Sequence, residues 1–392
     1  MGFFETVGGI LLAILALMFM VVIHESGHYL IGKLFKFKIN EFSIGFGKAL
    51  FKRKMKSGED FSIRLIPFGG YCAFEGEDEE NSDPRAFNNQ KPWKRLLVLV
   101  AGATFNLISA VLIISLTFTF YGDILPVTSV QSGYVSENSA FKETDIVLSI
   151  DGENFSFFNG TFNHTYSDGE HVAVVRRLDE NGKRYETTIT FTGEEYGFIS
   201  NSSLELYAYY LYKNGQTAPG FENFEFGEQF TTVSETDLEN NYSSVKAIIE
   251  RGNCVSYQFY RVKFSFFEAF GRGFLSTFRI VGLVISTFIG LFTGGTPLSD
   301  VGGPITLITM IGESAAVNPA SLMYLICLIS ANLGVFNLLP IPSLDGSRMV
   351  FVAIEWIRGK PVSQKVEGLV HFIGLIALFG FAILVDVLRL FR

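Results

Sequence analysis

The chain has 392 residues, of which 48% are hydrophobic and 18% are charged. Soluble domains average about 25% charged residues, so this composition argues against a cytosolic protein. The formal net charge of −8 argues against a nucleic-acid-binding protein, because such proteins present a basic face to their ligand.

Three apolar stretches are almost free of formal charge. They are residues 8–31, 96–121 and 366–385, and each is long enough to cross a hydrocarbon core of about 30 Å. Two further apolar stretches lie between the second and the third of these, at 264–292 and 322–340, and two arginines interrupt the stretch 264–292. Because no basic residue precedes the first stretch, it does not resemble a removable signal peptide, and we expect it to remain as a span. The sequence therefore predicts an integral membrane protein.

The charges between the first two predicted spans indicate the orientation. Residues 33–64 contain nine Lys or Arg against three acidic residues. By the positive-inside rule this loop is cytoplasmic, so residues 123–260 are expected outside. That outer segment holds 21 acidic and eight basic residues, as a solvated domain does. Alternating apolar residues within it predict β-strands at 145–150, 171–175 and 187–191.

A β-hairpin is predicted in the cytoplasmic loop, because residues 39–46 and 61–66 are joined through a turn at 56–60. An exposed strand edge can bind an extended peptide substrate by adding it to the sheet as a further strand. The alternative is a hairpin that has no contact with substrate.

The first predicted span contains an H-E-x-x-H motif formed by His24, Glu25 and His28. On a helix, two histidines four residues apart project from one face and can bind one zinc ion, and the glutamate can act as general base. An ionisable cluster inside a span costs several kcal/mol unless it is paired or metal-bound. This cost favours a functional site over the alternative, in which these side chains merely pack against other helices.

A third zinc ligand is predicted at Asp345. Pro340 and Pro342 break the apolar stretch 322–340 shortly before this residue. A broken helix at membrane depth lines a cavity or a site. Taken alone, the segment would be interpreted as an ordinary turn. Together with the H-E-x-x-H motif it completes the three protein ligands that catalytic zinc needs beside an open position.

The sequence resembles the site-2 protease family of intramembrane zinc metalloproteases. Within that family it is similar to the bacterial group with an extracytoplasmic PDZ domain, the regulator of sigma-E protease type. The resemblance is carried by the two zinc motifs and by several glycine- and asparagine-containing segments. The matching segments are 24–28, 43–47, 67–71, 101–106, 303–305, 332–337 and 344–346.

The resemblance implies a reaction and a set of site residues. It implies that Zn²⁺ is bound by His24, His28 and Asp345 and that Glu25 activates water for peptide hydrolysis. The residues that it implies for substrate binding are Asn332, Asn337, Gly45 and Gly47.

The chain also departs from the pattern of the family. Ala103 stands where the family has Pro, and Ser347 and Arg348 stand where it has a Gly-His pair. Residues 139–152 keep the outline of a PDZ core strand and turn, but their Pro-Ala and Gly-Asp pairs are altered. None of these changes touches a predicted metal ligand. We therefore expect the PDZ-like fold, while the altered pairs argue against peptide binding by that domain.

The expected metal site constrains the number of membrane crossings. The H-E-x-x-H motif lies near the cytoplasmic end of its span, and Asp345 lies just past the C-terminal end of 322–340. The two helices must therefore run in the same direction, which requires an odd number of crossings between them. Because 96–121 supplies one crossing, we expect 264–292 to lie along the outer membrane surface as an interfacial helix.

The predicted fold is a polytopic α-helical membrane protein with four transmembrane helices, an inserted β-rich PDZ-like extracytoplasmic domain and a membrane-associated β-hairpin. Residues 1–122 hold the first two spans and the hairpin loop 39–74. Residues 123–262 form the PDZ-like domain, in which the polar segment 211–250 is an insertion or a mobile extension. Residues 263–392 hold the interfacial helix and the last two spans. We expect a multi-pass plasma-membrane protein with its active site near the cytoplasmic side.

The predicted function is cleavage of the transmembrane segment of single-pass membrane proteins. The expected partners are this substrate and the lipid bilayer, and no nucleic acid. The resemblance implies anti-sigma factors or remnant signal peptides as substrates. Two alternatives remain. A zinc transporter would need ligands on several spans along a path, whereas a membrane PDZ scaffold would need an intact carboxylate-binding loop.

Overall fold

The structure is a computed structural model, in which the chain divides into two compact units that are described separately. Unit 1 comprises Met1–Thr119 and Ser265–Arg392, and unit 2 comprises Phe120–Phe264. The residues that the structure describes are 3–77, 82–129, 133–136, 138–156, 165–297 and 301–390.

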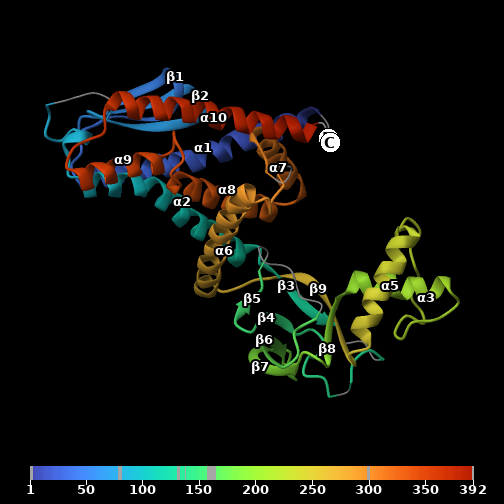
Figure 1. Ribbon diagram of the computed structural model, residues 1–392. Coiled ribbons are helices and arrows are strands. Elements are labelled where there is room, and N and C mark those ends of the chain that lie inside the picture. Colours follow the sequence, from blue (N-terminus) through green and yellow to red (C-terminus); the bar gives the residue numbers. More distant parts are fainter. Residues whose placement is uncertain are drawn as a thin grey trace. The chain divides into compact units, whose positions relative to one another are not determined.

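Unit 1 is mainly helical (Figure 1). Its helices are α1 (Phe3–Leu34), α2 (Pro92–Phe120), α6 (Phe266–Thr293), α7 (Pro304–Val317), α8 (Pro319–Leu338), α9 (Asp345–Arg358) and α10 (Gln364–Leu390), with a short 3₁₀ turn, η1, at Phe87–Asn89. Helix α7 is not anticipated by the sequence analysis. It packs on α1 and α8 through an apolar core that includes Ala13, Met20, Ile311 and Leu325.

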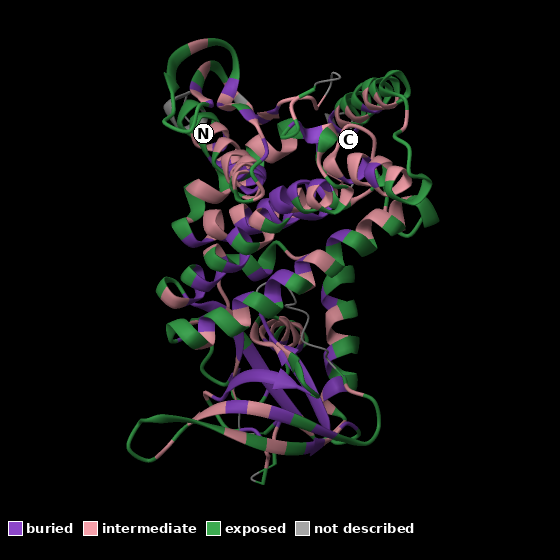
Figure 2. Ribbon diagram, turned by 90° about the vertical axis from the view of Figure 1, so that its left-hand side faces the viewer, coloured by how far each residue is buried: buried purple, intermediate pink, exposed green. Residues whose placement is uncertain are grey.

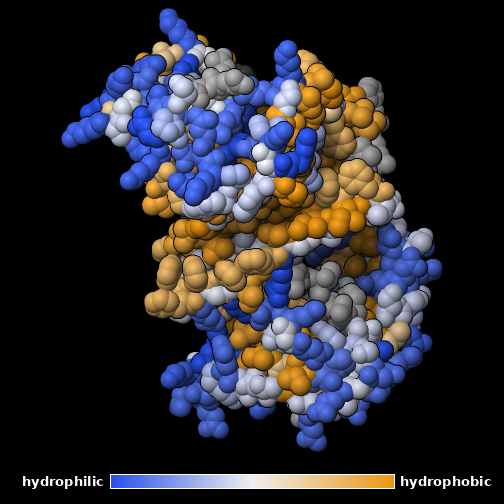
Figure 3. Space-filling view, turned by 60° about the vertical axis from the view of Figure 1, so that its left-hand side comes forward, coloured by the Kyte–Doolittle hydropathy of each residue, from blue (hydrophilic) through white to orange (hydrophobic). Residues whose placement is uncertain are grey.

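Five helices in the described part of the chain are long and apolar enough to cross a membrane: α1, α2, α6, α8 and α10. Many of their side chains are exposed although they are apolar; on α10, Phe372 and Phe379 are 60% and 61% exposed. Figure 3 shows such hydrophobic side chains gathered over a broad part of the surface. Apolar surface of this extent fits a lipid environment. The chain is therefore a multi-pass membrane protein. Helix α6, which the sequence analysis expects at the membrane surface, also has the length and hydropathy of a span. The number of four spans therefore stays a prediction.

The predicted hairpin is confirmed and is longer than expected. Strands β1 (Ile39–Lys54) and β2 (Asp60–Phe74) pair antiparallel. Phe42 pairs with Phe61 in the first half of β2 and with Cys72 in the second half, so the start of β1 lies between the two halves. The last part of β2, residues 70–74, consequently forms an edge of this sheet. Phe74 at the end of this edge belongs to an apolar core that joins the hairpin to α2 and α9.

Unit 2 contains a mixed sheet in the order β7-β6-β4-β3-β9-β8, with β5 paired to β4. Strand β4 is buried along its whole length, and Figure 2 shows buried residues running through the sheet. The three strands predicted from alternation are confirmed as β4, β6 and β7. The strands are β3 (Asp123–Ser129), β4 (Ile146–Ile150), β5 (Glu153–Asn154), β6 (Glu170–Leu178), β7 (Arg184–Thr192), β8 (Tyr196–Ser200) and β9 (Asn253–Val262).

The polar segment expected as an insertion or mobile extension folds into helices between β8 and β9. They are α3 (Asn201–Lys213), α4 (Glu228–Thr231) and α5 (Glu235–Ile249). Ser200 and Ser234 cap the first and last of these by accepting a backbone N–H bond, as serine does at helix N-termini. The helices share an apolar core with strands β8 and β9, which includes Leu204, Val245 and Ile248. The segment is thus an ordered part of unit 2.

Candidate active site

The structure brings the three predicted metal ligands together. His24 and His28 lie one turn apart on α1, and Asp345 is the first residue of α9. Oδ2 of Asp345 lies 3.0 Å from Nε2 of His24 and 3.3 Å from Nε2 of His28. The two Nε2 atoms are 3.1 Å apart, and all ligand atoms lie within 4.8 Å of one another. One ion can therefore contact all three side chains.

The other nitrogen of each histidine is held by α2. Nδ1 of His28 donates to the carbonyl oxygen of Val98 at 2.8 Å, and Nδ1 of His24 lies 3.3 Å from Nδ2 of Asn106. Metal-binding histidines donate the second ring N–H in this way, which fixes the ring and turns Nε2 toward the metal. The buried Oδ1 of Asn106 has no partner in the described part of the chain. A half-turn of this amide places Oδ1 as acceptor for His24. The two histidines and the aspartate thus fit zinc.

Two glycines let α1 and α2 approach closely enough for this arrangement. A Cβ atom on Gly102 would overlap the rings of both His24 and His28, and one on Gly27 would overlap the backbone of Ala101. A side chain at either position would therefore push the helices apart. This packing explains why a glycine stands beside the metal cluster on α2.

The turn before Asp345 also depends on a glycine. A Cβ atom on Gly346 would overlap the carbonyl group of Leu339, so the chain can double back after α8 only with glycine there. Ser343, with a φ of 80°, takes the left-handed conformation that the tight turn requires. Its backbone N–H donates to Nδ1 of His371 on α10 at 3.1 Å. These contacts fix where α9 begins, and with it the carboxylate of Asp345.

A cavity of about 620 Å³ opens beside the cluster. Glu25, His28 and Asp345 line one part of it, and residues 71–74 of β2 line another. The carboxylate of Glu25 lies beside the backbone N–H of Cys72. The carboxylate of Glu25 thus lies beside the metal cluster and faces a cavity that is also lined by a strand edge. This is the position of a general base that activates water for attack on an extended peptide.

The four residues expected to bind substrate are not among those that line the cavity in the described structure. Asn332 is half-buried on α8, and Nδ2 of Asn337 donates to the carbonyl oxygen of Leu333 in the same helix at 2.9 Å. Gly45 and Gly47 have φ values of 87° and 82° and let β1 bend. Their contact with substrate therefore remains a prediction.

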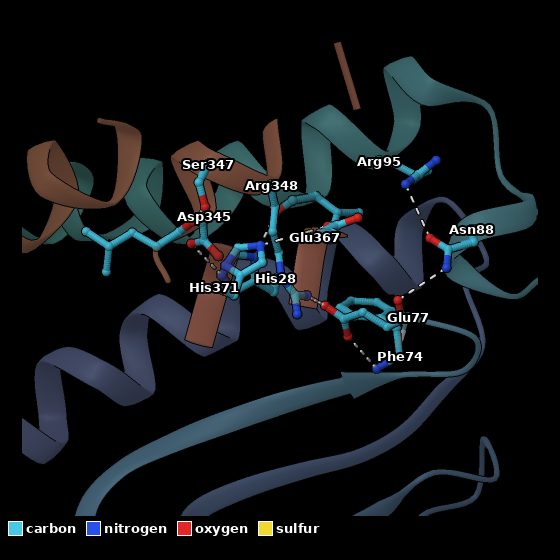
Figure 4. A network of polar contacts seen from close by, with 12 residues as sticks. His28, Phe74, Glu77, Asn88, Arg95, Asp345, Ser347, Arg348, Glu367 and His371 are labelled. Atoms are coloured by element: carbon cyan, nitrogen blue, oxygen red, sulfur yellow. Dashed lines mark hydrogen bonds and ion pairs between the residues drawn. The ribbon is translucent and has the colours of Figure 1, made fainter. Parts of the chain in front are cut away.

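The sequence did not predict the positions of several further residues at the site. Arg348 lines the cavity and pairs with Glu77, as Figure 4 shows. His371 also lines the cavity, and its Nδ1 accepts from the backbone N–H of Ser343. Asn106 contacts His24 from α2. Tertiary structure brings these residues to the site, although Asn106 lies in the segment 101–106 that carries the resemblance.

The geometry defines a metal-dependent hydrolase site carried by apolar helices. The sequence matches Peptidase family M50 over residues 12–381. The chain therefore belongs to this family and is a zinc metallopeptidase, with His24, His28 and Asp345 as the candidate metal site.

Proteins from three bacteria, each named as a candidate zinc metalloprotease, are similar to the chain over nearly all of their length. The protein of Clostridium acetobutylicum is 30% identical over 389 residues, which cover 99% of this chain and 97% of the relative. The protein of Brucella suis is 28% identical over 393 residues, covering 96% and 93%. The protein of Fusobacterium nucleatum is 27% identical over 389 residues, covering 97% and 99%.

Proposed function

We propose that this zinc metallopeptidase cleaves peptide bonds in the transmembrane segments of single-pass membrane proteins. The observation that carries the proposal is the cluster of His24, His28 and Asp345 beside Glu25 among apolar helices, with Glu25, His28 and Asp345 lining one cavity. Polar groups at such a position are costly unless they serve a site. Their convergence on a single point favours hydrolysis over zinc transport, which needs ligands along a path.

Each residue of the cluster has a part in the proposed reaction. His24, His28 and Asp345 hold the metal, and α2 orients the two imidazoles through their Nδ1 atoms. Zinc, when bound, supplies the positive charge that polarises a carbonyl group and acidifies water. Glu25 takes a proton from the attacking water and gives it to the nitrogen of the leaving amine. The carboxylate of Glu25 lies beside the amide of Cys72, at the edge of the hairpin.

The edge formed by residues 70–74 is the proposed substrate-binding element. It lies in the wall of the cavity, and one of its amides already contacts the general base. Pairing of an extended substrate with this edge would keep its peptide bonds out of helical hydrogen bonds and within reach of the metal. Asn332, Asn337, Gly45 and Gly47 complete the proposed substrate-binding set.

The finer assignment follows the resemblance to the bacterial group with an extracytoplasmic PDZ domain. We infer four spans with an interfacial helix at 264–292, since two arginines interrupt that stretch. Residues 1–122, 123–262 and 263–392 are the proposed parts, with the middle one outside and the active site near the cytoplasm. The PDZ-like part would limit access to substrates already trimmed outside. The proposed substrates are anti-sigma factors or remnant signal peptides.

The test combines zinc analysis with cleavage of a single-pass model substrate by the purified full chain. Glu25→Gln should retain about one zinc ion per chain and lose cleavage, and Asp345→Ala should lose both. Glu313→Gln, which changes an exposed carboxylate on α7, should behave as the unmodified chain. A scaffold or a transporter would bind zinc or partners without Glu25-dependent cleavage. Cleavage that persists in Glu25→Gln would contradict the proposed mechanism.

A further inference from the structure

The backbone amides of the edge strand 70–74 point alternately to its two sides. Glu75, just past the strand, donates its N–H to the carbonyl oxygen of Lys38 on the β1 side at 2.9 Å. By this alternation the N–H of Cys72 lies on the side away from β1, beside the carboxylate of Glu25. The outer edge of the strand is therefore the side that faces the general base.

Phe74 is the next residue whose amide lies on the outer edge, and there the edge is occupied. Its N–H donates to Oε2 of Glu77 at 3.3 Å, while Oε1 of Glu77 forms an ion pair with Arg348 on α9 (Figure 4). One carboxylate thus caps the end of the strand and binds the guanidinium group. Arg348 stands three residues after the metal ligand Asp345, so the same helix supplies a metal ligand and this contact.

The ion pair is part of a ring of polar contacts, of which Figure 4 shows the links from Glu77 through Asn88 to Arg95. The carbonyl oxygen of Glu77 accepts from Nδ2 of Asn88 at 3.2 Å, and Oδ1 of Asn88 accepts from Arg95 on α2 at 3.2 Å. Arg95 in turn donates to Glu355 on α9 at 2.7 Å. Glu77 is only 18% exposed at its side chain. Because the ring returns to α9, Glu77 is held both at its carboxylate and at its backbone carbonyl group.

We propose that the Arg348–Glu77 ion pair is the end stop of the substrate-binding edge and so determines which peptide bond is cleaved. The inference rests on the proposed function, since it requires a substrate strand added along residues 70–74. Such a strand could pair at Cys72 but could pass Phe74 only by displacing Glu77 from a partly buried ion pair, which is unfavourable. The stop therefore fixes the register of the strand relative to the metal cluster.

The expected consequence of losing the stop is a shift of the cleavage site by two residues. A strand that slips by one residue turns every side chain to the opposite face, so a register that keeps the same faces moves in steps of two. With Glu77→Ala or Arg348→Ala we expect the product displaced by two residues to increase about fivefold relative to the main product, the ratio that about 1 kcal/mol produces. Arg348→Lys keeps the charge and should keep the main site.

The experiment maps the cleaved bonds by mass spectrometry, using the full chain and one single-pass substrate. Arg85→Ala is the matched control, because Arg85 pairs with Asp83 at 3.2 Å without touching the edge and is 61% exposed. It should leave both the cleavage site and the rate unchanged. In the Glu25→Gln background, a photoreactive residue at one substrate position should crosslink to a narrow part of 70–74, and Glu77→Ala should broaden it.

The outcomes separate the end stop from the proposed function. If the unmodified chain gives no Glu25-dependent product, the proposed function fails. If it cleaves one main bond, and Glu77→Ala and Arg348→Ala cleave the same bond in the same proportion, the end stop is wrong although the protease remains. Loss of zinc in Arg348→Ala with an unchanged site in Glu77→Ala would also overturn it, because Arg348 would then act on Asp345.

Discussion

Replacement of Asn106 by alanine should weaken zinc binding by about 10- to 100-fold, the usual loss when a residue that orients a metal ligand is removed. Asn106 is fully buried, and its amide lies 3.3 Å from Nδ1 of His24. Without the amide, the Nδ1–H group of His24 loses its acceptor, and an unmet buried donor costs about 1–3 kcal/mol. A free energy of this size corresponds to about 5- to 150-fold in affinity, a range that includes the expected loss.

The affinity is measured by competition between the purified chain and a chelator of known strength. Asn106→Asp retains an acceptor and should bind more tightly than Asn106→Ala. Thr104→Ala is the matched control, since Thr104 is exposed on the same helix and its hydroxyl donates to the carbonyl oxygen of Val100 at 2.9 Å rather than contacting a histidine. Equal zinc affinity in Asn106→Ala and the unmodified chain would refute the argument that α2 orients His24.

Two further predictions concern Asp386 and the pair formed by His171 and Asp151. The carboxylate of Asp386 on α10 accepts hydrogen bonds from the first backbone amides of α7, with a distance of 2.9 Å to the nitrogen of Ile305. Asp386→Ala should remove about 1 kcal/mol of helix capping and speed hydrogen exchange at the start of α7 about fivefold. In unit 2, Asp151 lies 2.6 Å from His171 and raises the pKa of that histidine. The stabilisation is complete below about pH 6.5 and is lost as pH rises through the raised pKa. Asp151→Asn should thus lower the unfolding midpoint at pH 6, with little change at pH 9.

The parts of the site that could be predicted are those with a local pattern or a local anomaly. His24 and His28 are four residues apart, and helix geometry alone places them on one face. Asp345 follows two prolines that break an apolar helix. This local pattern indicated a metal ligand although Asp345 lies 321 residues from His24. The hairpin followed from alternation and a turn. Each of these signals is contained within a few neighbouring residues.

The parts that could not be predicted depend on contacts between distant residues. Glu77 and Arg348 are 271 residues apart, and neither has a neighbour pattern that indicates the other. The side chain of Asn337 donates to the backbone of its own helix, a contact that its matching segment does not indicate. Helix α7 is short and follows a stretch rich in glycine, so its apolar residues gave no distinct signal. Such features appear only after the helices pack.

The separation of the metal ligands along the chain has a consequence for biogenesis. Ribosomes add about 5–20 residues per second, so the aspartate follows the first histidine after roughly 15–65 s. During that interval the nascent polypeptide has two imidazoles but not the carboxylate. Membrane insertion of the first helix is thus separated in time from hydrolytic competence, and the enzyme becomes active only once translation has passed most of its length.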